Sequence, residues 1–220
     1  MAKHLHREIE SLKKMILALG ARVEENVYKA VRSLEERDQA LAGQVIAGDA
    51  EVDQEEIDVE EECLKVLALY QPVAGDLRMI VSILKINSDL ERVGDLAVNI
   101  AERALFLATH DRPNIPLDFT KMVEKTRTML RMSLDALVNR DAAAAHEVMG
   151  ADDEVDEVNR EMYGLIQETI RKDPDRLESL IHLLSCSRHL ERIADHATNI
   201  AEDVIYMIEG EIVRHQHEKY

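Results

Sequence analysis

The sequence predicts an all-α protein made of two tandem three-helix bundles. Its composition is the first reason, because 220 residues include only four prolines, eight glycines and 3% aromatic residues. An internal repeat is the second, since residues 90–102 return at 190–202 with nine identical positions. Apolar residues in both copies recur at alternating steps of four and three residues. This pattern places them in one stripe along a helix, the seam by which the helix packs against its neighbours. Repetition over most of a chain indicates one structural unit used twice.

The first half contains three long helical patterns. We expect the first helix over about residues 5–36 and the second over about residues 39–70. We expect the third helix to end at about Ala108. Asp38 precedes the second pattern and is placed to cap that helix. The turn 71–75, Gln-Pro-Val-Ala-Gly, ends the second helix because proline and glycine both break helices. Asp76 is placed to cap the third helix.

The second half repeats this plan after a linker, residues 109–116, which holds two prolines in eight residues. We expect its first helix over about residues 117–139 and its second over about residues 141–171. We expect its third helix to end near Glu209. Asp173, Pro174 and Asp175 open the last helix, and Gly210 is a suitable C-cap. The predicted domains are therefore residues 1–108 and 117–220.

Charge and composition exclude several classes of protein. A formal net charge of −17 argues against nucleic acid or an anionic membrane as the main partner. No signal-peptide core is present, and no apolar run is long enough to span or insert into a bilayer. Cys63 and Cys186 lie on apolar helical stripes, so we expect two reduced core thiols. From these observations we expect a cytoplasmic location.

Four pairs of acids interrupt or flank the apolar seams. They are Asp49/Asp53, Glu91/Asp95, Asp152/Asp156 and Glu191/Asp195. Like charges four residues apart on a helix repel by about 0.2–0.5 kcal/mol, and partial burial adds to that cost. One explanation is a solvated acidic face, or acids paired with Arg78, Arg92, Arg103 and their counterparts. The other is a site for a hard cation such as Mg, Ca, Mn or Fe, which duplication of the pairs in register favours.

No other constellation indicates a reaction. The sequence has no glycine-rich phosphate loop and no Gly-x-Ser-x-Gly motif, and it lacks the Glu-x-x-His pairs of ferritin-like di-iron proteins. His182, His189 and His196 are interpreted as partly buried or surface residues. Two function classes remain, a regulatory adaptor and a metal-dependent enzyme or metal store. An enzyme needs open metal positions and a general base in a cleft, so the sequence favours the adaptor.

The segment 190–203, its counterpart 90–102 and the turn 71–78 resemble motifs of the PhoU family, and the resemblance covers essentially the whole chain. It implies two three-helix bundles that bind multinuclear iron or zinc clusters, or another divalent cation such as Mn or Mg. The implied metal ligands are Asp49, Asp53, Glu91, Asp95, Asp152, Asp156, Glu191 and Asp195.

The resemblance also implies a function. Members of this family are negative regulators of phosphate uptake and phosphate-starvation signalling, not enzymes. They act in the cytoplasm, usually as homodimers, between a Pst-type ABC importer with its ATPase and a PhoR-type histidine kinase. The second copy of the motif has Ala194, His196 and Thr198 where the first has glycine, leucine and valine, which leaves room for a difference between the two sites.

Overall fold

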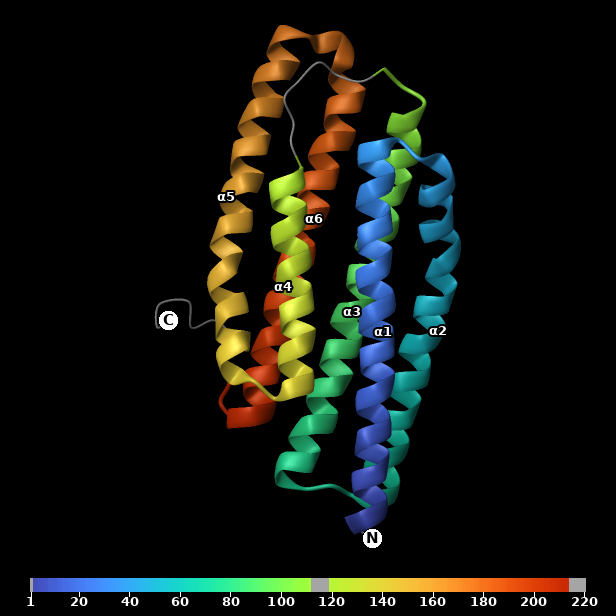
Figure 1. Ribbon diagram of the computed structural model, residues 1–220, viewed down its shortest axis with the longest axis vertical. Helices are drawn as coiled ribbons and strands as arrows, with labels where there is room; N and C mark the ends of the chain where they lie inside the picture. The colour runs from blue at the N-terminus through green and yellow to red at the C-terminus, as the bar shows by residue number, and fades with distance from the viewer. Residues whose placement is uncertain (1, 112–118, 214–220) are drawn as a thin grey trace.

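The computed structural model describes residues 2–111 and 119–213 and shows an elongated bundle of α-helices (Figure 1). The helices are α1 (Ala2–Glu36), α2 (Gln39–Tyr70), α3 (Ala74–Ala108), α4 (Thr120–Asn139), α5 (Ala142–Lys172) and α6 (Leu177–Glu209), with a 3₁₀ turn η1 (Pro174–Arg176) before α6. Within those two ranges there is no strand, which confirms the predicted all-α class. Most of the predicted linker, the predicted start of the fourth helix and residues 214–220 lie outside the described residues.

The turns between the first and second helix of each half have the same construction. Arg37 and Arg140 both adopt left-handed backbone, with φ values of 57° and 53°. Asp38 and Asp141 follow them as N-caps, each accepting a hydrogen bond from the backbone N–H three residues on, at 3.0 and 3.1 Å. The predicted cap at Asp38 is confirmed. The repeat therefore extends to backbone conformation and helix capping.

The predicted cap of the third helix was wrong. The helix begins at Ala74, two residues before Asp76, and its N-cap position is Val73, which makes no side-chain capping bond. The chain reverses through left-handed Gln71, so the helix restarts sooner than the Pro-Gly spacing suggested. Asp76 lies in the first turn, where its charge still faces the positive end of the helix dipole.

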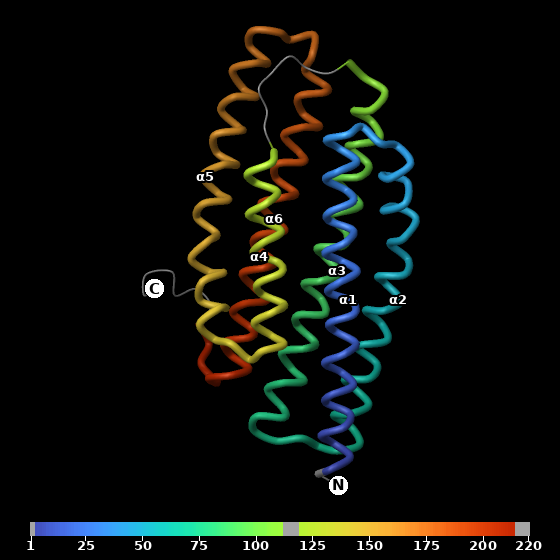
Figure 2. The backbone as a smooth tube through the Cα atoms, viewed as in Figure 1, coloured from blue at the N-terminus to red at the C-terminus, as the bar shows by residue number. Residues whose placement is uncertain are grey.

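Helices α3 and α6 run side by side at the centre of the molecule (Figure 2), and α1 also contacts α4. One continuous cluster of buried apolar side chains includes residues from both halves. The division into domains 1–108 and 117–220 stays a prediction, because the halves share this core. Cys63 and Cys186 are buried and free, as expected, and burial raises the pKa of each thiol to about 12.

Two glycines allow close approach between helices. A Cβ atom on Gly94 would lie 3.2 Å from Val52 Cγ1, so glycine here brings α3 close to α2. A Cβ atom on Gly20 would lie 3.0 Å from both methyl carbons of Leu134, so the contact between α1 and α4 also depends on a missing side chain. Gly20 thus helps to join the two halves.

Polar side chains connect α3 and α6 across the centre. Lys85 Nζ lies 3.1 Å from Asp203 Oδ1, and the Asp203 residue is only 1% exposed. His196 Nδ1 lies 2.8 Å from Asp89 Oδ1, and His196 is buried. The sequence did not predict these pairs. The departures from the repeat were the available signal, because the residues at the positions equivalent to Asp89 and Asp203 are His189 and Arg103.

Candidate functional site

A first carboxylate cluster lies where α2 packs against α3. It consists of Asp49 and Asp53 on α2 with Glu91 and Asp95 on α3. Partial burial, then the charges of Asp53 and Asp95, raise the pKa of Asp49. Partial burial, then the charge of Asp95, raise the pKa of Glu91. Acids from two helices therefore repel one another across their contact.

Glu56 extends this first cluster. Partial burial and the charges of Glu60 and Asp53 raise the pKa of Glu56. Its Oε1 accepts a hydrogen bond from Asn87 Nδ2 on α3 at 2.9 Å. In the second half the corresponding contact joins Asn159 and Ser187 and carries no charge. Glu56 stands in the sequence where the apolar seam of α2 calls for an apolar residue, whereas its partner on α3 could not be read from the sequence.

The second cluster lies at the equivalent contact between α5 and α6. It consists of Asp152, Asp156, Glu191 and Asp195. Partial burial, then the charges of Asp195 and Asp156, raise the pKa of Asp152 from 3.8 to about 6. Partial burial is also the main cause of the raised pKa values of Glu191 and Asp195, and the charge of Asp156 adds to both. Each repeat thus carries one cluster of coupled acids.

The two clusters differ in their neighbours. The Thr198 hydroxyl opposes the rise in the pKa of Asp152, and the charge of His196 opposes that of Asp195. The first repeat has valine and leucine at those positions, which can neither donate a hydrogen bond nor carry a charge. The departures from the repeat therefore alter the electrostatics of the second cluster.

Most of these acids form no ion pair with a basic side chain in the described ranges. No ion pair involves the first cluster among residues 2–111 and 119–213. In the second cluster, Asp156 alone forms an ion pair within these ranges, at 3.6 Å from Arg160. Of the arginines that one alternative offered as partners, Arg103 pairs with its neighbour Glu102 at 3.5 Å. Most acids of the two clusters therefore have no ion-pair partner among the described residues.

The donor chemistry of both clusters fits a hard cation, because carboxylate oxygens are the ligands that such ions prefer. The placement of the side chains is not yet that of a formed site. In the part of the chain that the structure describes, no three His, Cys, Asp or Glu side chains are arranged to hold a metal ion. Metal binding at all eight predicted ligands stays a prediction, and it requires side-chain rotation to bring the oxygens together.

The chain is thus an all-helical protein made of two repeats of three helices. Each repeat has one cluster of carboxylates. The model of the PhoU domain matches residues 16–104 and again residues 119–204. The chain belongs to the PhoU family.

Relatives with assigned names support this membership. The chain is 42% identical to a phosphate-specific transport system accessory protein PhoU homolog of Aquifex aeolicus, over 98% of this chain and 97% of that one. The crystal structure of PhoU from Pseudomonas aeruginosa is 36% identical and covers 94% of this chain and 99% of its own, with a TM-score of 0.89. The phosphate transport system regulatory protein PhoU from Streptococcus pneumoniae has a TM-score of 0.84 at 30% identity, covering 95% and 99%. None of the helices described here is long and apolar enough to cross a membrane.

Proposed function

We propose that this protein is a cytoplasmic negative regulator of phosphate uptake and of phosphate-starvation signalling. In this role it binds the ATPase of a Pst-type ABC importer and a PhoR-type histidine kinase, and it catalyses no reaction. Membership of the PhoU family supports the general role, since relatives are accessory proteins of phosphate-specific transport systems. We further propose that the protein acts as a homodimer, which light scattering on the purified chain tests.

The observation that carries the proposal is the duplicated acidic cluster, in which Asp156 alone forms an ion pair among the described residues. Partial burial and mutual repulsion raise the pKa of Asp49, Glu91, Asp152 and Glu191, so the fold maintains an unfavourable charge arrangement twice. A purely structural role would favour neutral residues here. Acids on a surface orient and accelerate docking to basic surfaces on a partner, which is the role proposed for these clusters.

The same clusters are the proposed sites for iron, zinc or another divalent cation. Asp53 and Asp95 are exposed, so their side chains are free to turn toward their half-buried neighbours Asp49 and Glu91. A bound cation would supply positive charge that relieves the repulsion among the acids. Metal content after purification, and titration of the chelated protein with Fe²⁺, Zn²⁺ and Mn²⁺, test this part of the proposal.

Charge reversal tests the regulatory role. We expect Glu91→Lys/Asp95→Lys to derepress a phosphate-starvation reporter in phosphate-rich medium, in a strain whose own copy of the gene is deleted. Glu157→Lys/Glu161→Lys is the matched control, because these exposed acids have the same spacing on α5 outside the cluster. The control is expected to keep the reporter silent.

Affinity purification of both variants from phosphate-rich cells identifies the partners. The importer ATPase and the kinase are expected with the control and are expected to be lost with the cluster variant. A folded cluster variant that still silences the reporter and retains both partners would refute the docking role of the acids. Phosphatase and oxidase assays on the metal-loaded protein test the expectation that it is not an enzyme.

A further inference from the structure

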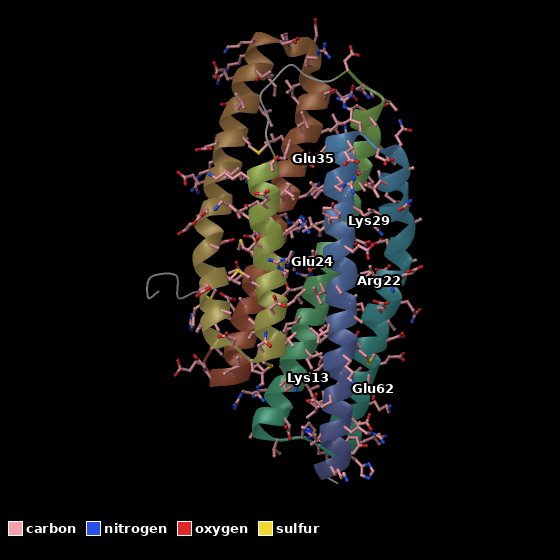
Figure 3. All side chains as sticks on the ribbon, in the orientation of Figure 1. Lys13, Arg22, Glu24, Lys29, Glu35 and Glu62 are labelled. Atoms are coloured by element: carbon pink, nitrogen blue, oxygen red, sulfur yellow. The ribbon has the colours of Figure 1, made fainter. Side chains whose placement is uncertain are left out.

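A second candidate site lies between α1 and α4, which belong to different repeats. It is a pocket of about 270 Å³ lined by Glu24, Glu124, Arg127, Thr128 and Arg131. Glu24 lies on the side of α1 that faces α4, whereas Arg22 lies toward α2, where it pairs with Glu51 and Glu55 (Figure 3). The pocket is separate from the acidic clusters, which lie on α2, α3, α5 and α6.

The two arginines of this pocket have no carboxylate partner in the part of the chain that the structure describes. No ion pair joins Arg127 or Arg131 to an acid in the described ranges, although the chain has 44 acidic and 27 basic residues. The Nε atom of Arg127 is buried and has no hydrogen-bond partner. Leaving a buried donor without a partner is unfavourable, and native proteins seldom do so. The two guanidiniums therefore keep donors that no acid of the described residues occupies, although Glu24 and Glu124 balance their charge in the lining.

Arg127 is held in place before any ligand arrives. Its guanidinium carbon lies 4.5 Å from the centroid of the Tyr28 ring on α1. Such stacking fixes the plane of the guanidinium and directs its donors. Arg131 is four residues further along α4, so both guanidiniums lie on one face of the helix. Two planar forks on one face suit the oxygens of a tetrahedral oxyanion.

The remaining lining residues accept hydrogen bonds. Glu24 and Glu124 are carboxylates, and the Thr128 hydroxyl donates its proton to the Glu124 carbonyl at 2.7 Å, which leaves the hydroxyl oxygen as an acceptor. A fully deprotonated anion such as sulfate offers these acceptors no proton. A phosphoryl ligand at neutral pH offers both charged oxygens and a proton donor. Its charged oxygens pair with arginine, and its remaining O–H, or a hydroxyl of an attached organic group, donates a hydrogen bond to these acceptors.

We propose that the pocket between the repeats binds a phosphoryl oxyanion with at least one O–H donor, either inorganic phosphate or a small hydroxylated phosphomonoester. The volume of about 270 Å³ suits a ligand of that size. Because α1 and α4 come from different repeats, bound ligand strengthens the contact between the two halves. This inference does not rest on the regulatory role proposed above.

Isothermal titration calorimetry of the full chain in a chelating buffer tests the proposal, because the chelator excludes phosphate bound through metal. Inorganic phosphate, glycerol phosphate and sulfate are the three titrants. We expect saturable binding of at least one phosphoryl ligand, and sulfate at least tenfold weaker. Whichever phosphoryl ligand binds more tightly identifies the source.

Variants assign the binding to this pocket. Arg131→Gln removes an exposed guanidinium and is expected to weaken phosphoryl binding at least tenfold while the protein stays folded. Lys121→Gln, an equally exposed change of the same charge on α4, is expected to leave binding unchanged. Glu24→Gln/Glu124→Gln is expected to reduce the preference for phosphoryl ligands over sulfate. No saturable binding at millimolar ligand, equal binding of sulfate, or an equal loss with Lys121→Gln would each overturn the proposal.

Discussion

Neutralising Asp152 is expected to stabilise the protein at neutral pH. Partial burial and the neighbouring charges of Asp195 and Asp156 raise the pKa of Asp152 from its ordinary 3.8 to about 6. The folded state therefore holds this proton more tightly than the unfolded chain does. The resulting contribution to stability is complete below about pH 3.8 and is lost as the pH rises through about 6. At neutral pH the ionised side chain destabilises the fold.

The size of this effect follows from the same pKa values. A rise in the pKa from 3.8 to about 6 corresponds to a free-energy difference of at most about 3 kcal/mol, since one pKa unit is about 1.4 kcal/mol. Asp152 is only partly buried, so solvent screening reduces the expected gain for Asp152→Asn to about 1–2 kcal/mol. A gain of that size raises the midpoint of thermal unfolding by about 2–8 °C in a chain of this length.

Urea unfolding in a chelating buffer, at neutral pH and near pH 4, measures this gain. The free energy of unfolding of Asp152→Asn is expected to exceed that of the parent protein at neutral pH only. Asp135→Asn, an exposed aspartate on α4, is the matched control and is expected to change little. An equal gain near pH 4, or no gain at neutral pH, would show that repulsion within the second cluster is not a cost to the fold.

Three further predictions concern the fold. Asp38→Ala and Asp141→Ala are each expected to lower the free energy of unfolding by about 1 kcal/mol, because both side chains cap equivalent helices; chemical denaturation of the two variants tests whether the losses are equal. Gly20→Val is expected to destabilise by about 1–3 kcal/mol through the contact with Leu134, whereas Gly150→Ala, which meets nothing within 4 Å, is expected to stabilise by about 0.5–1 kcal/mol; opposite shifts in the thermal midpoint would confirm this. Lys85→Met is expected to cost about 2–3 kcal/mol because Asp203 stays buried, and the double variant with Asp203→Asn should recover part of the loss in the same denaturation assay.

Much of the fold could be predicted from the sequence because helix formation depends on local chemistry. The limits of α2, the cap at Asp38 and the C-cap at Gly210 follow from side chains and breakers only a few residues away. Seam periodicity also assigned the acids to the margins of packed faces. The failure at Asp76 has a local cause as well, since the start of α3 depends on backbone conformation in the preceding turn.

Contacts between distant helices could be decided only by the tertiary structure. Periodicity predicts which face of a helix is buried, but it does not specify which residue of another helix lies opposite. The Asp89–His196 contact, the hydrogen bond from Asn87 to Glu56 and the unpaired Arg127 beside Tyr28 all depend on that alignment. Electrostatic coupling acts through space, so the strong perturbation of the pKa of Asp152 depends on how α5 and α6 are packed. The sequence by itself determined the helices, the repeat and the acidic positions, and the packing of the helices decided which charges face one another.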